Sequence, residues 1–303
     1  MRTRIHRFPQ IDNCPSKKIC VNLCNLWIVL RREETSVVLY EPKGLSTPTL
    51  CEPFINMTVQ ILGISFFNGD VDEAIEAMSQ RGGFVVAPSG TCFARLCEDE
   101  RYRCAILSAD LAIADSGLMV STWRVLQHEN VQRISGFKYL KHLLEKLKGK
   151  GTEEVFWVLP SERARQKLFD WSRREAFPIT REDCYVAPRY GPEVEDRNLI
   201  AMIQQRRPAH VIIAIGSGPQ EKLGFYLREN LSYRPAIHCI GAALGFITGE
   251  QTAIPDWADR FFLGWLFRAV AQPRHFIPRL MRGFELPWLI WKYGEKLPPL
   301  RNK

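Results

Sequence analysis

From Met57 onward, short apolar runs alternate with longer stretches in which apolar residues recur at helical spacing. The stretch "MTVQILGISF" at 57–66 alternates like a strand, and "DVDEAIEAMSQR" at 70–81 has the spacing and the acidic start of a helix. Further apolar runs of strand length follow, separated by helical patterns, at 83–90, 111–117, 154–162, 183–191, 209–221 and 235–245.

Strands that are apolar on both faces and alternate with helices are typical of a parallel α/β sheet. The pattern therefore predicts a Rossmann-like parallel sheet flanked by helices, with a short helical appendage at the C-terminus. In such sheets the ligand lies beyond the carboxyl ends of the strands. Four predicted strand ends carry residues suited to binding or catalysis: Ser89, Asp115, Tyr190 and the loop 216–221.

Asp115 ends the apolar run "LAIAD" and is followed by Ser116 and Gly117 before the next helical pattern. Two interpretations compete for this acid. Asp is a preferred helix N-cap, and spacing alone favours that role. A carboxylate beyond a strand end is also well placed to act as a general base, and the two roles can coexist.

The loop "IGSGPQE" resembles a dinucleotide-binding turn only in part. The GxGxxG pattern requires glycine at position 221, which is Glu221, so a nicotinamide-dependent oxidoreductase is disfavoured. Gly216 and Gly218 still precede a helix whose N–H groups suit a phosphate, and Gln220 with Glu221 suits sugar hydroxyls. The alternative is a tight turn in which Glu221 interacts favourably with the helix dipole.

Motifs for metal or serine chemistry do not appear. The sequence lacks HExxH and GxSxG, and its six histidines have no ligand spacing. Asp110 and Asp115 lie at the two ends of a predicted strand and are not expected to converge. The nine cysteines form no CxxC pair, which favours reduced thiols in the cytosol. The sequence therefore predicts neither a metal site nor a cofactor.

Residues 1–55 lack the regular pattern and hold four cysteines and several prolines. Two interpretations are open: a poorly ordered N-terminal extension, or a start assigned too early, with Met57 as the first residue. The apolar segment 19–30 follows basic residues but lacks a small-residue cleavage site, which argues against a signal peptide. The predicted α/β core spans residues 56–249.

A third region, 250–303, is rich in Trp, Phe and Arg, and prolines divide it into short helices. Aromatic residues beside arginines, without the length of a spanning segment, suit a membrane interface. An amphipathic subdomain packed on the core explains the pattern equally well. The net charge of +8 favours an anionic partner. Nucleic acid is the weaker choice, because the arginines alternate with aromatic residues.

Several blocks, taken in order, resemble one family. They begin with "GISFFNGDVDEAI" and "GGFVVAPSG", continue through "ADLAIADSGLMV", "QRISGFKYL" and "RPAHVIIAIGSGPQE", and end with "IGAALGFITGEQTAIPDW" and "LGWLFRAVAQPRHFIPRL". Over about residues 57–280 the chain resembles the bacterial WecG/TagA/CpsF glycosyltransferases, glycosyltransferase family 26. The order of the blocks carries this resemblance more than any single block does.

The resemblance implies inverting transfer of a sugar, typically N-acetylmannosamine, from a UDP-sugar to a polyprenyl-diphosphate-linked acceptor in cell-surface polysaccharide synthesis. It implies no required metal and names Asp115 as the general base. Together, the matching blocks and the strand ends suggest these substrate-binding residues: Ser89, Arg133, Gly136, Tyr190, Gly216, Gly218, Gln220, Glu221, Arg268, Arg274 and Arg279.

The resemblance also implies a location. The C-terminal appendage is expected to touch the membrane, which makes the protein cytoplasmic and peripheral at the inner face of the cell membrane. The expected partners are therefore the UDP-sugar, the lipid-linked acceptor and the membrane surface, and not nucleic acid. A homo-oligomer is left open.

The chain departs from the family's pattern at several polar positions. Ala87 stands where the family has Thr, Ser89 where it has Asn, and Pro160-Ser161 where it has two glycines. The family's Asp, Arg and Glu are replaced here by Gly245, Ala253 and Gly264, in that order. These changes indicate a divergent member. They also support an alternative function, a catalytically eroded paralogue that binds a nucleotide sugar or a lipid carrier, which the retained Asp115 and Gln220 oppose.

Overall fold

The computed structural model describes residues 57–148, 154–241, 243–249 and 283–301, together with three strands nearer the N-terminus. The chain divides into two compact units, Met1–Thr49 and Leu50–Lys303. In the first unit the described residues form an antiparallel sheet of β1 (Ile19–Leu23), β2 (Leu26–Leu30) and β3 (Val38–Leu39). The predicted domain limits at residues 55 and 250 stay predictions.

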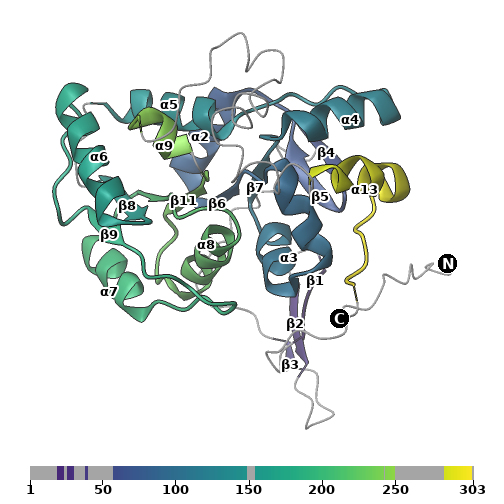
Figure 1. The fold of residues 1–303 in the computed structure, drawn as a ribbon. Coiled ribbons are helices and arrows are strands. Elements are labelled where there is room, and N and C mark those ends of the chain that lie inside the picture. Colours follow the sequence, from purple (N-terminus) through teal and green to yellow (C-terminus); the bar gives the residue numbers. More distant parts are fainter. Residues whose placement is uncertain are drawn as a thin grey trace. The chain divides into compact units, whose positions relative to one another are not determined.

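The second unit is built on an eight-stranded sheet with the order β4-β5-β7-β6-β11-β10-β8-β9 (Figure 1). All neighbouring pairs are parallel except β4 and β5, so the predicted α/β fold on a mostly parallel sheet is confirmed. The strands are β4 (Thr58–Ile61), β5 (Ile64–Phe67), β6 (Gly83–Val86), β7 (Leu111–Ile113), β8 (Val155–Leu159), β9 (Cys184–Val186), β10 (His210–Ile213) and β11 (Ala236–Cys239).

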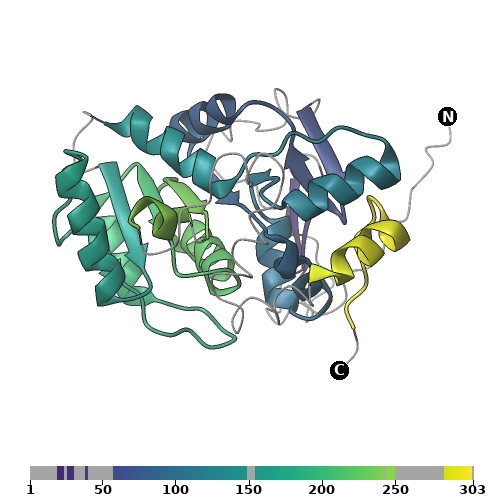
Figure 2. The same ribbon diagram turned by 45° about the horizontal axis from the view of Figure 1, so that its top comes forward.

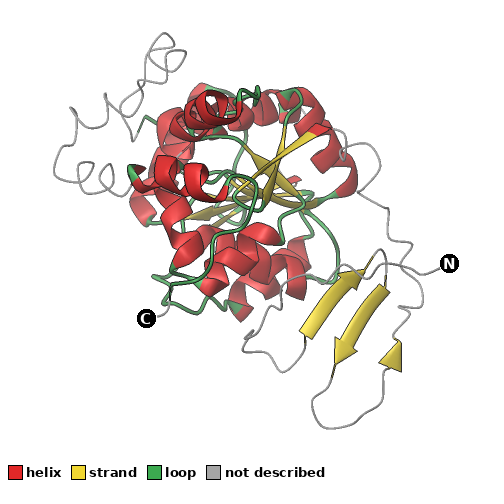
Figure 3. Ribbon diagram, turned by 90° about the vertical axis from the view of Figure 1, so that its right-hand side faces the viewer, coloured by secondary structure: helices red, strands yellow, loops and turns green. Residues whose placement is uncertain are grey.

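Helices cover both faces of this sheet (Figure 2, Figure 3). In β10, Val211 and Ile213 belong to the apolar cluster of one face, and Ile212 belongs to the cluster of the other. The first cluster includes residues of η2 (Gly90–Cys97), α3 (Glu100–Leu107), α4 (Gly117–Gln127), α7 (Arg197–Arg206), α8 (Pro219–Asn230) and α13 (Glu285–Tyr293). The second includes residues of α2 (Val71–Arg81), α5 (Gly136–Leu147), α6 (Glu162–Arg174) and α9 (Ala243–Ile247).

Residues 57–66, predicted as one strand, form two strands joined by a two-residue turn. Leu62 and Gly63 have positive φ angles of 51° and 79°, and β4 and β5 pair antiparallel around them. Apolar alternation continues through such a tight turn, so the pattern alone could not reveal it. The carbonyls of Gly294 and Glu295 accept hydrogen bonds from the Leu62 and Gly63 N–H groups, which ties the turn to the C-terminal segment.

The described part of the C-terminal region packs on the core. Helix α13 buries Leu286, Leu289 and Ile290 in the same apolar cluster as α4 and η2. Of the two interpretations of this region, packing on the core is therefore confirmed for residues 283–301. Residues 250–282 lie outside the described part of the chain.

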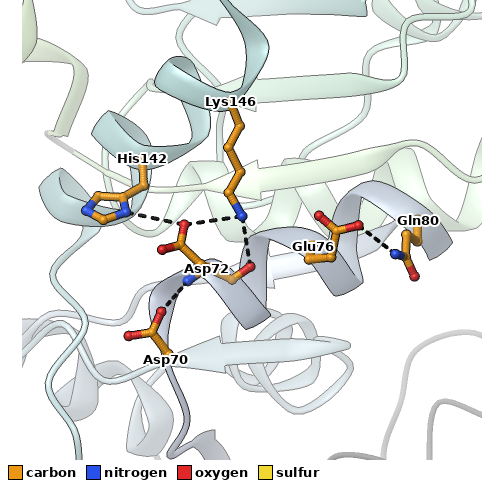
Figure 4. Close-up of polar contacts among 6 residues, drawn as sticks. All are labelled: Asp70, Asp72, Glu76, Gln80, His142 and Lys146. Carbon is orange, nitrogen blue, oxygen red and sulfur yellow. Dashed lines mark hydrogen bonds and ion pairs between the residues drawn. The ribbon is translucent and has the colours of Figure 1, made fainter.

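A surface group of charged residues joins α2 to α5 (Figure 4). The Asp72 carboxylate lies 3.2 Å from Lys146 Nζ and 3.4 Å from His142 Nδ1, and hydrogen bonds from Lys146 and His142 lower the pKa of Asp72. Asp70 caps α2 by accepting a hydrogen bond from the Asp72 N–H. Exposed ion pairs contribute little to stability, so this group is expected to add little to the packing of α2 against α5.

A buried polar chain links α5 to the sheet. Tyr139 Oη lies 3.1 Å from His238 Nδ1, and His238 Nε2 lies 3.1 Å from His210 Nδ1. Burial, and then the neighbouring His210, hold the pKa of His238 well below 6.5. The folded protein therefore keeps the His238 ring neutral at a pH where an exposed histidine takes up a proton.

Acidification is expected to destabilise the fold through His238. Below about pH 6.5 the unfolded chain binds a proton at His238 that the folded chain does not bind. The free energy of unfolding should therefore fall with decreasing pH, by up to about 1.4 kcal/mol per pH unit for this one proton. Above about pH 6.5 the full contribution of the neutral His238 to stability should be present.

Urea unfolding between about pH 5.5 and about pH 7.5 measures this slope. His238→Gln should flatten the profile, whereas His128→Asn, at an exposed position with a left-handed backbone, should leave it unchanged. If His238→Gln keeps the full slope, the pH dependence comes from another group.

Candidate active site

Three of the predicted site residues meet at the carboxyl end of β7. This strand ends at Ile113, and the Asp115 carboxylate accepts a hydrogen bond from the Gly136 N–H at 2.8 Å. Arg133 Nε donates to the Asp115 carbonyl oxygen at 3.1 Å. The structure thus brings Asp115 together with Arg133 and Gly136, which lie in a different block of the sequence.

Ser116 caps helix α4, and its Oγ accepts a hydrogen bond from the Met119 N–H at 3.2 Å. The interpretation of Asp115 as the cap of the following helix is therefore wrong. The Asp115 carboxylate lies instead at the first residue of α5, where the positive end of a helix dipole favours an anion. The carboxylate is thus held by the first residue of α5 rather than by the helix that follows it in the chain.

Gly136 sits where three loops converge. A Cβ atom at this position would lie 3.0 Å from the Ile240 carbonyl oxygen, 3.8 Å from Ala243 Cβ and 3.9 Å from Ala87 Cβ. Ile240 follows β11 and Ala87 follows β6, so the start of α5 fits closely between the ends of these neighbouring strands. A side chain at position 136 would push against backbone, which explains glycine there.

Asn68, which follows β5, was not among the predicted site residues. Its Oδ1 accepts a hydrogen bond from the Gln132 N–H at 2.6 Å, and its Nδ2 donates to the Asn130 carbonyl at 3.3 Å. The side chain therefore holds the loop that carries Arg133. A polar residue directly after a strand is the signal that could have revealed it, but the hairpin hid this strand.

Glu221 is fully buried at the start of α8. Its carboxylate accepts hydrogen bonds from the Gly218 N–H, from Ser217 Oγ at 3.2 Å and from Gln220 Nε2 at 3.0 Å. Burial raises the pKa of this carboxyl group. Glu221 therefore lies in the first turn of α8, and its favourable interaction with the helix dipole stays a prediction.

Gln220 is also fully buried and joins two loops. Its Oε1 accepts a hydrogen bond from the Gly241 N–H at 3.2 Å, and its carbonyl accepts one from Cys239 Sγ at 3.1 Å. These contacts tie the loop after β10 to the loop after β11. The role of Gln220 and Glu221 as contacts for sugar hydroxyls stays a prediction; their contacts here hold the glycine loop in place.

Ser89 is connected to the glycine loop through Cys92. Ser89 Oγ is 3.1 Å from Cys92 Sγ, and Cys92 Sγ is 2.7 Å from Ser217 Oγ. Ser89 is the N-cap residue of η2 without a side-chain capping bond. A short polar chain therefore connects the ends of β6 and β10, the positions of Ser89, Gly216 and Gly218.

Tyr190 lies elsewhere, near the edge strand β9. Its hydroxyl donates to Asp196 Oδ2 at 2.7 Å, beside the Tyr185 hydroxyl, which donates to the same oxygen at 2.8 Å. Asp196 caps α7 by accepting a hydrogen bond from the Leu199 N–H. Burial, and then Asp196, raise the pKa of Tyr185 to about 12. Tyr190 thus stabilises the start of α7, and substrate binding by it stays a prediction.

The remaining predictions concern arginines and metals. Arg268, Arg274 and Arg279 lie outside the described residues. Asp110 does not converge with Asp115, because it accepts a hydrogen bond from the Phe84 N–H at 2.8 Å at the other end of β7. Within the described ranges no three potential metal ligands come together. The expectation that the protein needs no metal stays a prediction.

The fold and the site define a class of protein. A carboxylate, an arginine and a glycine loop feeding a helix all lie at the carboxyl edge of a parallel α/β sheet, where such sheets bind ligands that carry phosphate. This arrangement is typical of an enzyme that handles a nucleotide-linked substrate.

Residues 59–300 match the model of the glycosyl transferase WecG/TagA/CpsF family, and the chain belongs to this family. A curated relative is the N-acetylglucosaminyldiphosphoundecaprenol N-acetyl-beta-D-mannosaminyltransferase of Bacillus spizizenii. It is 23% identical over 196 residues, which cover 64% of this chain and 73% of the relative. The protein is therefore a glycosyltransferase, and both matches agree with a role in cell-surface polymer synthesis.

Proposed function

We propose that the protein is an inverting glycosyltransferase in cell-surface polysaccharide biosynthesis. It moves N-acetylmannosamine, or a related sugar, from a UDP-sugar to a polyprenyl-diphosphate-linked acceptor. The observation that carries this proposal is the Asp115 carboxylate, held beyond β7 by Gly136 and next to Arg133, in a chain whose family match spans residues 59–300. The name of the curated relative supports the choice of donor and acceptor.

In the proposed reaction, Asp115 takes the proton from the acceptor hydroxyl. The acceptor oxygen then forms a bond to the anomeric carbon from the face opposite the diphosphate, while the bond to the diphosphate breaks and UDP leaves. The configuration at the anomeric carbon is therefore inverted. General-base assistance of this kind contributes about 10²–10⁴-fold to a rate. Charge that builds up on the departing diphosphate needs positive groups or N–H donors nearby.

Purified protein tests the proposal directly. With UDP-N-acetylmannosamine and polyprenyl-diphosphate N-acetylglucosamine, we expect UDP release that depends on the acceptor, a product with the inverted anomeric configuration, and unchanged turnover in EDTA. A thermal-shift panel of nucleotide sugars identifies the donor if a related sugar is used, because a specific ligand raises the melting temperature. Absence of acceptor-dependent transfer from every nucleotide sugar would contradict the proposal.

A second function, a catalytically eroded paralogue that binds a nucleotide sugar or a lipid carrier, is favoured by one position. Ala87 lies beside Gly136 at the site and carries only a methyl group where the resembling family carries a hydroxyl. Such a protein would show a melting-temperature rise with a nucleotide sugar but no transfer and no donor hydrolysis. The two outcomes separate the enzyme from the binding protein.

We infer that the protein is cytoplasmic and peripheral at the inner face of the cell membrane. Within the described residues, no helix combines the length and apolar character needed to span a bilayer. Helices α4 and α13 pack together, and large apolar side chains on them are exposed: Trp291 and Val125 are each 70% exposed, and Phe284, the residue before α13, is 60% exposed. Lys292 Nζ lies 4.8 Å from the ring centroid of Trp288 on the same helix. Exposed aromatic residues beside a cation suit the surface of an anionic bilayer.

Trp291→Ser should weaken binding to vesicles that contain phosphatidylglycerol, by about tenfold if the ring contributes about 1.4 kcal/mol of apolar burial in the bilayer. Co-sedimentation with the full chain measures the effect. Met202→Ser, on α7 and also exposed, is the matched control and should bind like the wild type. Equal binding by Trp291→Ser and Met202→Ser would exclude this face from membrane contact.

A further inference from the structure

Arg95, on the short helix η2, lies against the glycine loop that follows β10. Its Nη1 donates to the Ser217 carbonyl oxygen at 3.0 Å. A Cβ atom on Gly218 would lie only 1.6 Å from Arg95 Nη1, and Gly218 has a positive φ of 102°. The guanidinium group therefore occupies the space that a side chain at position 218 would need, and the positive φ favours glycine there.

The positive charge of Arg95 forms no ion pair with any described carboxylate. The two neighbouring acids are already engaged. Asp99 accepts hydrogen bonds from Lys222 Nζ at 2.7 Å and from the Tyr102 N–H at 3.0 Å. The carboxylate of Glu221 accepts from the loop itself. Within the described part of the chain, this partly buried guanidinium makes one hydrogen bond, to a neutral carbonyl, and so retains donors for an anion.

The surroundings of Arg95 suit a phosphorylated ligand. Ser217 and Ser89, joined through Cys92, place two hydroxyl groups beside the loop. Among the residues that the structure describes, none lies within 4 Å of the position that a Cβ of Gly216 would occupy. All these groups follow the carboxyl ends of β6 and β10, the edge that also holds Asp115.

We propose that Arg95 binds the diphosphate of the nucleotide-sugar donor and neutralises charge on the departing UDP. This inference rests on the proposed function, and it assigns the cation that the leaving group requires. A guanidinium can contact two phosphate oxygens at once, which a single point charge does not do with the same geometry. The loop glycines let the guanidinium approach the backbone, and the Ser217 carbonyl fixes its orientation.

Arg95→Gln is the decisive variant, because glutamine keeps an N–H donor for the Ser217 carbonyl but has no charge. We expect it to weaken UDP binding by about 10- to 100-fold, the range for one lost charge-assisted contact, while uridine binding stays unchanged. The value of kcat/KM for the donor should fall in parallel. Arg95→Lys should be intermediate. Arg101→Gln removes the same charge from an exposed position and should bind UDP like the wild type.

Calorimetry with UDP, uridine and inorganic diphosphate separates the outcomes. Wild-type affinity for UDP in Arg95→Gln would overturn the inference while the proposed function stands. If the wild type transfers no sugar but binds inorganic diphosphate through Arg95, the proposed function fails and the anion site remains. Equal losses of UDP and uridine affinity in Arg95→Gln would assign Arg95 a purely structural role. A wild type that binds neither UDP nor diphosphate would overturn both.

Discussion

Asp115→Asn is expected to reduce turnover by about 10²–10⁴-fold, the usual contribution of a general base. Asparagine has the same shape, and its side-chain oxygen can still accept the hydrogen bond from the Gly136 N–H. The variant should therefore fold normally and bind donor normally. It loses only the ability to take a proton from the acceptor hydroxyl. Acceptor-dependent UDP release under saturating donor measures the change in kcat.

Asp72→Asn is the matched control, because it makes the same substitution in the exposed ion pair that joins α2 to α5 (Figure 4). It should keep wild-type turnover. Near-normal turnover in Asp115→Asn would remove Asp115 from the role of base. Loss of turnover together with a large drop in melting temperature would show a structural role instead. The melting temperature is therefore measured as well, because the Asp115 carboxylate accepts the hydrogen bond from Gly136.

Glu221→Ala is expected to lower the free energy of unfolding by about 3 kcal/mol or more. The substitution removes the acceptor of two buried donors, the Gly218 N–H and the Gln220 amide, and one acceptor of the partly buried Ser217 hydroxyl. Each unsatisfied buried donor costs about 1–3 kcal/mol, and the costs are not fully additive because the loop can relax. Urea unfolding at neutral pH measures the loss.

Glu221→Gln restores an acceptor oxygen and should recover a large part of the stability lost in Glu221→Ala. Glu76→Ala, on the exposed face of α2, removes a carboxylate that accepts a hydrogen bond from Gln80 and should change stability little. Similar stability of Glu221→Ala and the wild type would contradict the role assigned to these contacts. If Glu221→Ala loses more donor binding than its fraction of unfolded protein accounts for, the glycine loop of the folded variant is displaced.

Much of the architecture could be predicted because it depends on local periodicity. The run at 209–221 contains β10 and the start of α8, and the run at 111–117 contains β7 and the turn before α4. Side chains that face both covered sides of the sheet must be apolar, so these strands are visible in the sequence. The hairpin at Leu62 and Gly63 was not predicted, because a tight turn leaves the alternation of apolar and polar residues intact.

Arg95 and Asn68 were not predicted as site residues for a different reason. Each is an ordinary polar residue in the sequence, and Arg95 is one of 41 lysines and arginines. Their significance comes from partners far along the chain: Ser217 for Arg95, and Gln132 for Asn68. Gln220 and Glu221 were predicted as site residues, but their complete burial was not visible in the sequence.

The sequence by itself determined the α/β class, the positions of most strands and the placement of Asp115 just beyond one of them. These properties follow from residues close together in the chain. Only the tertiary structure decided that the Asp115 carboxylate turns to Gly136, and that the loops after β6, β10 and β11 contact one another. The order of strands in the sheet decides which loops become neighbours. That order depends on packing between distant segments, which no local pattern encodes.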